Sequence, residues 1–220
     1  MNEVVLVTGS ETLTGRKLIE KLLARGSQVV APVAGKETDT NKTDTPNLTV
    51  LTWNRSSWFS TKAVIREIIR QFGRIDTAWL LHQPAPAVQD FSDAGSSDIE
   101  LVLEQSIKGS IAMTREVLPL LEASGGFLGM VLPHRTGAAP GPLDALASGA
   151  FKGFSGALIR ETNPLLWACG FQGNSPDADG FASELLRLND EKPDKLRGRW
   201  YRYADGRRPF GGSAFVDTIN

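Results

Sequence analysis

Cysteine is nearly absent from this sequence. Cys169 is the only one, so no disulfide can form within the chain, and a reducing compartment is expected. An excess of either charge is also missing, with 24 Lys and Arg against 25 Asp and Glu. A near-neutral chain gives no electrostatic reason to expect nucleic acid or a membrane surface as a partner. No apolar run approaches the roughly 20 residues that span a bilayer, and the first residues lack the basic region of a signal peptide. We therefore expect a cytoplasmic protein.

Histidine and tyrosine are scarce as well. The histidines are His82 and His134, and the tyrosines, Tyr201 and Tyr203, fall in the last expected strand. The histidines show no metal-ligand spacing such as H-x-x-x-H, so no metal site is predicted.

What the sequence does contain is a regular alternation of short apolar runs with helical patterns. This alternation predicts a three-layer αβα fold, with a doubly wound, Rossmann-like parallel sheet of about seven strands in one domain, residues 1–220. Strands are expected at Val4–Val7, Gln28–Pro32, Leu48–Thr52, Thr77–His82, Gly126–Pro133, Leu165–Phe171 and Arg199–Tyr203. Helices are expected at Gly15–Ala24, Ser60–Phe72, Ser97–Glu122, Pro142–Glu161 and Ala178–Leu188, and Thr38–Pro46 reads as a polar loop. Ligands of such sheets bind beyond the carboxyl ends of the strands, where the strand order reverses.

Four stretches carry a resemblance to a known family. They are "LVTGSETLTGRKLIEKLLARGSQVV", "GRIDTAWLLHQ", "SIKGSIAMTREVLPLLEASGGFLGMVLP" and "ALASGAFKGFSGALIRE". Together they resemble the short-chain dehydrogenase/reductase family over essentially the whole chain. The resemblance implies an NAD(P)-dependent oxidoreductase. In that family a Tyr protonates the substrate oxygen, a Lys lowers the pKa of that Tyr, a Ser orients the carbonyl and an Asn anchors a proton relay.

The phosphate-binding loop departs from the family's T-G-x-x-x-G-x-G pattern. Thr8, Gly9 and Gly15 match, but Leu13 replaces the middle glycine, and in the alternative G-x-x-G-x-x-G register Thr12 replaces it. The missing glycine is the one that lets the backbone approach a pyrophosphate. Gly9 and Gly15 have a structural explanation as well, because a tight turn and close strand–helix packing need them. We interpret the loop as retained for packing.

The remaining cofactor positions are altered too. The second expected strand ends without the acidic residue that holds a ribose hydroxyl or the basic one that holds a 2′-phosphate. The adenine-binding Asp of the family falls at Trp53-Asn54, where Asn54 is a weak substitute. No cofactor is therefore expected, although weakened binding of NAD or NADP remains open.

The reactive positions of the family are all substituted. The resemblance aligns Ser106 with the Asn, Pro133 with the Ser, Asp144 with the Tyr and Ser148 with the Lys. The family's mobile substrate loop is shortened to residues 173–176. These losses indicate a divergent member without the catalytic tetrad, a pseudoenzyme.

Two functions remain open. His82 and His134 lie at the carboxyl ends of expected strands. Together with Asp144 they could form a replacement acid–base or ligand-binding set, with Ser148 nearby. That set would make the protein an unusual NAD(P)-dependent oxidoreductase or a small-molecule sensor.

The other function is association. In the family, two long helices of each subunit form an interface, and here these are residues 97–122 and 142–161. The second is rich in glycine, alanine and serine, and each glycine costs a helix about 1 kcal/mol relative to alanine. Close packing of helices across an interface would compensate. We favour a structural or regulatory subunit of a homo- or hetero-oligomer, pairing with itself or with a catalytic relative. The C-terminal "RGRWYRYADGRRPFGG" is expected to add an edge strand and interface, with Asp205-Gly206 as a turn.

Overall fold

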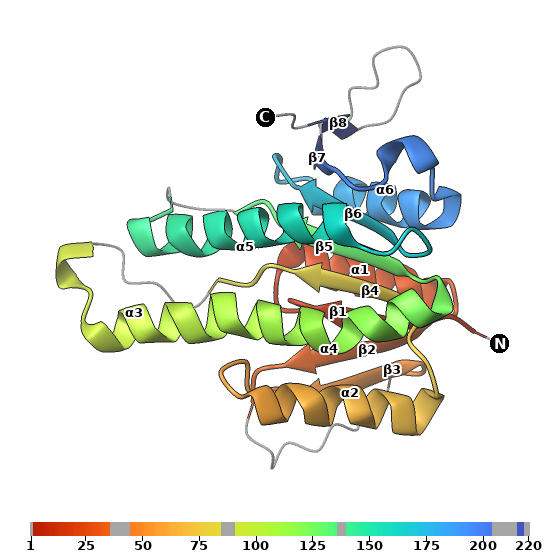
Figure 1. Cartoon of the computed structure of the whole chain (residues 1–220), viewed down its shortest axis with the longest axis horizontal. Helices are drawn as coiled ribbons and strands as arrows, with labels where there is room; N and C mark the ends of the chain where they lie inside the picture. Colours follow the sequence, from red (N-terminus) through yellow and green to blue (C-terminus); the bar gives the residue numbers. More distant parts are fainter. Residues whose placement is uncertain (1, 36–44, 85–90, 136–139, 204–214, 218–220) are drawn as a thin grey trace.

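A three-layer αβα sandwich forms from the described part of the chain (Figure 1). The computed structural model describes residues 2–35, 45–84, 91–135, 140–203 and 215–217. The expected polar loop falls largely, and the Asp205-Gly206 turn entirely, outside these residues. None of the described helices is both long and apolar enough to cross a membrane.

The sheet has the order β3-β2-β1-β4-β5-β6-β7-β8. The strands are β1 (Val4–Thr8), β2 (Gln28–Val33), β3 (Leu48–Thr52), β4 (Thr77–Leu81), β5 (Phe127–Leu132), β6 (Trp167–Gln172), β7 (Trp200–Tyr203) and β8 (Phe215–Asp217). β1 to β7 are parallel, and β8 pairs antiparallel to β7. The order reverses between β1 and β4, which places the crevice for a ligand at the carboxyl ends of these two strands.

Helices cover both faces of the sheet. They are α1 (Leu13–Ala24), α2 (Trp58–Phe72), α3 (Ser96–Val102), α4 (Gly109–Ser124), α5 (Pro142–Glu161) and α6 (Ala178–Glu191). One face carries α2, α4 and α5, and the other carries α1 and α6 (Figure 1). Each face has its own buried core, with Met113 and Phe151 on the first face and Leu18 and Phe181 on the second. Strands buried on both faces explain why runs such as Ala78–Leu81 are apolar throughout.

The predicted fold class is confirmed, and most element boundaries differ from the expected ones by one to three residues. α1 begins at Leu13, two residues before the expected start, because the Thr12 hydroxyl caps it by accepting a hydrogen bond from the backbone N–H of Gly15. The expected helix 97–122 is α3 and α4 joined by a π-helical turn, Leu103–Lys108 (labelled η2). Such turns often mark functional sites.

One expectation about the C-terminal strand is wrong. β7 was expected at the edge of the sheet, but β8 pairs with it through Tyr201, Arg202 and Tyr203. The short run Phe215–Asp217 has no alternation long enough to reveal a strand in the sequence. The antiparallel β8 is therefore the edge of the sheet on this side.

Candidate functional site

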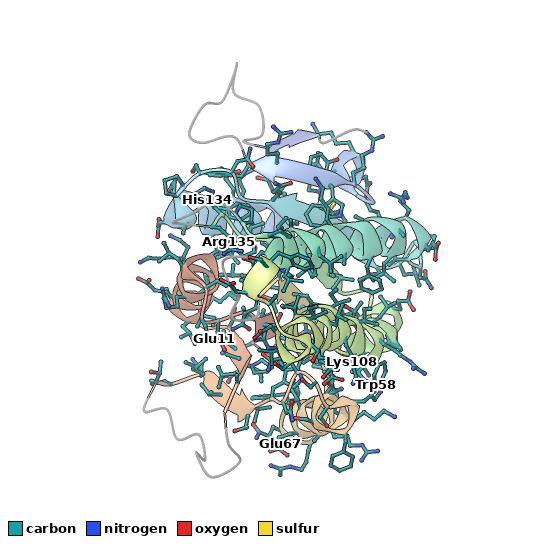
Figure 2. All side chains as sticks on the ribbon, turned by 90° about the vertical axis from the view of Figure 1, so that its left-hand side faces the viewer. Glu11, Trp58, Glu67, Lys108, His134 and Arg135 are labelled. Atoms are coloured by element: carbon teal, nitrogen blue, oxygen red, sulfur yellow. The ribbon has the colours of Figure 1, made fainter. Side chains whose placement is uncertain are left out.

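A cleft of about 730 Å³ opens at the carboxyl ends of the strands. It is lined by Glu11, Thr12, Leu13, Thr14, Arg16, His82, Pro84, Leu132, Pro133, His134, Arg135, Pro140, Asp144, Ser148, Gln172, Gly173, Asn174, Ser175, Pro176 and Ala178. Figure 2 is viewed from the side of the carboxyl ends and shows Glu11 below His134 and Arg135. The cleft occupies the position that the switch in strand order predicts.

The loop between β1 and α1 is held by its own contacts. Gly9 has φ +68°, a conformation that side chains rarely adopt. A Cβ on Gly15 would lie 2.2 Å from the backbone oxygen of Gly9. The backbone N–H of Thr12 also donates to the Gly9 carbonyl, at 3.0 Å. Turn geometry and close packing therefore account for both glycines without a ligand.

Leu13 is the residue of this loop that faces a prospective ligand. It is the first residue of α1, is 45% exposed and lines the cleft. Backbone N–H groups at a helix N-terminus favour phosphate, but a pyrophosphate approaching α1 would meet the isobutyl side chain. The residues present here do not fit a dinucleotide in its usual position.

The other positions aligned with cofactor contacts serve local structure. Asn54 is exposed, and its side-chain oxygen accepts from the backbone N–H of Ser56. Thr8 is buried, and its hydroxyl accepts from the backbone N–H of Leu81, joining β1 to β4. Neither residue lines the large cleft.

Asp144, at the position aligned with the family's tyrosine, is part of an ion pair. Its carboxylate is 2.6 Å from the guanidinium of Arg135, and the Asp144 side chain is only 6% exposed whereas that of Arg135 is 45% exposed. Arg135 therefore has a partner and is not a free cation in the cleft. Asp144 lies in the first turn of α5, which begins at Pro142, and proline favours the first turn of a helix.

His82 lies at the end of β4 and is 4% exposed. Its ring packs on Phe151 with a centroid distance of 5.2 Å, and its Nδ1 has no hydrogen-bond partner within the described part of the chain. The pKa of His82 is lowered to about 4, first by burial and then by the charge of Arg55, while Asp144 partly offsets both effects. His82 is thus neutral at pH 7.

The cleft brings together most of the sequence-predicted candidates. His82, His134, Asp144, Ser148 and Pro133 all line it, because parallel strands end at one edge of the sheet. The short loop 173–176 lines it too. Ser106 does not, since it is buried in the π-helical turn.

The two tyrosines also lie away from the cleft. The hydroxyl of Tyr201 donates to the carbonyl of Lys195, and that of Tyr203 donates to the carboxylate of Asp177. Within the described residues, no three His, Cys, Asp or Glu side chains gather as metal ligands. The polar chemistry of the cleft therefore includes a neutral imidazole, hydroxyl groups and a paired carboxylate, with the exposed charged residues Glu11 and Arg16 also lining it.

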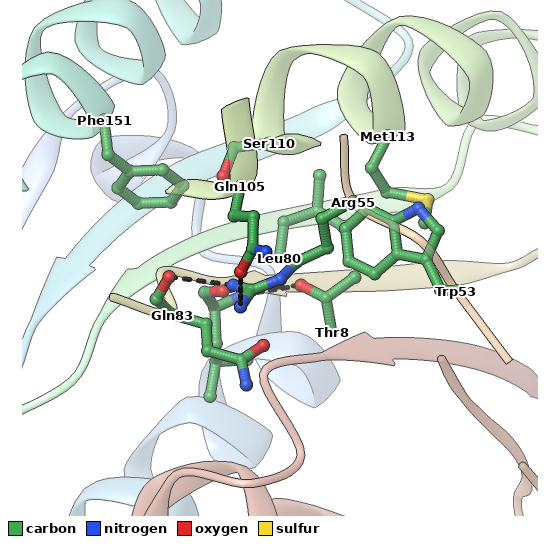
Figure 3. Close-up of a pocket in the computed structure, with 10 residues that line it drawn as sticks. Thr8, Trp53, Arg55, Leu80, Gln83, Gln105, Ser110, Met113 and Phe151 are labelled. Carbon is green, nitrogen blue, oxygen red and sulfur yellow. Dashed lines mark hydrogen bonds between the residues drawn. The ribbon is translucent and has the colours of Figure 1, made fainter. Parts of the chain in front are cut away.

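Arg55 is the residue that the sequence analysis missed. It follows β3 and lines a small cavity of about 10 Å³ between the strand ends and η2 (Figure 3). The available signal was a cation three residues after the half-buried strand β3, at the edge where ligands bind.

Comparison with known proteins establishes the family. A family model described as short chain dehydrogenase matches residues 3–131. This chain belongs to the short-chain dehydrogenase family. No curated protein is significantly similar to it.

Solved structures of short-chain dehydrogenases share its fold. One from Serratia marcescens is 13% identical with a TM-score of 0.73, over 91% of this chain and 94% of that chain. The 3-ketoacyl-(acyl-carrier-protein) reductase of Brucella melitensis, solved with NADH, is 18% identical with a TM-score of 0.72, over 93% and 98% of the two chains. The putative carbonyl reductase Sniffer of Caenorhabditis elegans is 14% identical with a TM-score of 0.73, over 92% and 97%. Because these sequence identities are low, the similarity of this short-chain dehydrogenase to the three structures is a similarity of fold.

Proposed function

We propose that this short-chain dehydrogenase is a non-catalytic member of its family and acts by association, as a structural or regulatory subunit. The observation that carries the proposal is the Asp144–Arg135 ion pair at the aligned tyrosine position. Hydride transfer of the family type needs a proton donor there with a pKa matched to neutral pH. A carboxylate held against a guanidinium is the wrong acid, and Ser148 supplies no cation beside it.

The first test is a calorimetric titration with NADH and NADPH up to millimolar concentration, combined with turnover assays on a panel of alcohols and ketones. We expect no heat of binding and no oxidation or reduction, because Leu13 lies where the phosphates would approach. Micromolar binding with clear turnover would contradict the proposal. Binding without turnover would retain the subunit role but make it cofactor-dependent.

The surface of α5 supports association. Its outward residues Ala145, Gly149, Gly153 and Ala157 recur at a spacing of four and are exposed. A Cβ added at Gly149 or Gly153 would meet nothing within 4 Å in the described structure. These two glycines therefore have no packing role within the described subunit, although they weaken the helix. An approaching helix explains them, and Leu146 on the same helix is 48% exposed.

The Gly149→Ala/Gly153→Ala variant tests this surface. The new methyl groups strengthen the helix of an isolated subunit by up to about 2 kcal/mol in total, but they block a close helix contact. We expect weaker self-association by sedimentation velocity, together with a higher unfolding midpoint of the dissociated chain. Phe59→Ala is the control, because Phe59 is 77% exposed on α2, away from α5. If the unmodified chain is already monomeric and the two substitutions only stabilise it, self-association is excluded. The next test is then whether the same surface of α5 binds a catalytic relative.

A second function, a small-molecule sensor or an unusual oxidoreductase, is favoured by one observation. His82, His134 and Asp144 line one cleft of about 730 Å³, a volume within the range of ligand pockets. The unpartnered Nδ1 of His82 beside that cleft is a polar group that a ligand or water would satisfy.

A further inference from the structure

The buried guanidinium of Arg55 holds together three parts of the fold. Arg55 is 8% exposed. Its Nη1 donates to the backbone oxygen of Gln83 at 3.0 Å, and its Nη2 donates to Oε1 of Gln105 at 3.3 Å. Figure 3 shows the guanidinium between these two residues, one beyond β4 and the other in η2. Arg55 thus connects the end of β3, the end of β4 and the π-helical turn.

Both partners of Arg55 are neutral. Among the described residues, no carboxylate lies within 4.0 Å of its guanidinium. Burial lowers the pKa of Arg55, and among the described residues the acid that opposes this effect is Glu11, which forms no ion pair with it. The neighbouring His82 is neutral, so it adds no charge of either sign. A positive charge removed from water needs a counter-charge, and none of the described residues places one beside it.

A cavity lies next to this charge. It measures about 10 Å³ and its lining includes Thr8, Arg55, Gln83, Gln105 and Ser110. Such a volume holds one particle about the size of water. Oε1 of Gln105 accepts the hydrogen bond from Arg55. The amide nitrogen of Gln105 therefore remains a donor without a partner in the described structure. A guanidinium and a side-chain amide are donors that suit an anion.

We propose that this cavity binds one small monovalent anion, of the size of chloride, held by Arg55 and Gln105. The volume excludes phosphate, sulfate and the pyrophosphate of a dinucleotide, so this site is distinct from the crevice in front of Leu13. The anion supplies the missing counter-charge of Arg55. The anion also stabilises the position of η2 against the carboxyl ends of the strands. η2 begins with Leu103, which is 43% exposed.

The experiment compares melting temperatures at one fixed ionic strength in sodium chloride, bromide, formate and gluconate. For the unmodified chain we expect a melting temperature a few degrees higher in chloride or bromide than in gluconate. An anion that binds only the folded state raises the melting temperature, and gluconate is too large to enter the cavity. A rise in chloride and bromide but not in formate supports the proposal, because formate has three non-hydrogen atoms and exceeds the cavity. A rise in formate alone, or one as large as that in chloride, would contradict it.

Two variants separate this site from general salt effects. Arg55→Gln removes the charge, and we expect the difference between salts to disappear. Arg135→Gln removes a cation that lines the larger cleft, and we expect the difference to remain. Equal midpoints in all four salts for the unmodified chain, or the same differences in Arg55→Gln, would overturn the proposal. If Arg55→Gln does not fold, a crystal of the unmodified chain grown in bromide decides. Anomalous density beside Arg55 supports the site, and its absence refutes it.

Discussion

Replacing Gly15 by alanine is expected to lower the free energy of unfolding by about 2–3 kcal/mol, in the absence of any nucleotide. The added Cβ would lie 2.2 Å from the backbone oxygen of Gly9 and 2.9 Å from its carbonyl carbon. These are backbone atoms, so no side chain can rotate away, and the first turn of α1 must move from β1. Urea unfolding followed by circular dichroism measures the loss.

Gly35→Ala is the matched control. It makes the same chemical change in the loop after β2, where the nearest atom to the new Cβ is a methyl group of Thr52 at 3.9 Å. We expect a change within about 0.5 kcal/mol. Equal stability of the Gly15→Ala and Gly35→Ala variants would mean that packing does not require Gly15. Its retention would then point to a ligand, against the proposal of an inactive loop.

The fold could be predicted because its signals are local and redundant. The run Ala78–Leu81 is apolar at consecutive positions, as a strand covered by helices on both faces must be. α5 matches the predicted range from Pro142 to Glu161, because a proline marks its first turn. The features that were missed depend on contacts distant in sequence or on very short segments. β8 is recognised only by its pairing with β7, and the π-helical turn leaves no mark in the apolar pattern.

The candidate site was predictable in its members and not in its contacts. Parallel strands end at one edge, so His82 after β4 and His134 after β5 had to lie near each other and near the start of α5. The ion pair of Arg135 with Asp144 depends on side-chain rotamers, which a sequence pattern does not encode. Arg55 was overlooked for the same reason. A cation after a strand ordinarily extends into solvent, and only the three-dimensional packing shows it turned inward.

The stability of the chain should fall between pH 6.5 and pH 4 because of His82. In the folded state its pKa is lowered from 6.5 to about 4 by burial, with the charge of Arg55 as the second cause. In the unfolded chain the imidazole regains its ordinary pKa, so between these values the unfolded state binds more protons. The stabilisation is complete above pH 6.5 and is lost as the pH falls to 4. The shift corresponds to about 3 kcal/mol, measured as the free energy of urea unfolding at a series of pH values.

His82→Asn separates this effect from general acid denaturation. Asparagine does not titrate in this range, so the variant should be less stable at pH 7, where it loses the contact with Phe151, but its stability should change less between pH 6.5 and pH 4. His134→Asn is the control, and because it leaves His82 in place we expect the acid loss to persist. A profile of His82→Asn as steep as that of the unmodified chain would show that water reaches the imidazole. The floor of the cleft would then be hydrated, and His82 would be open to a ligand as a proton acceptor. The expected flattening would instead mark His82 as a buried neutral group that keeps a second positive charge away from Arg55.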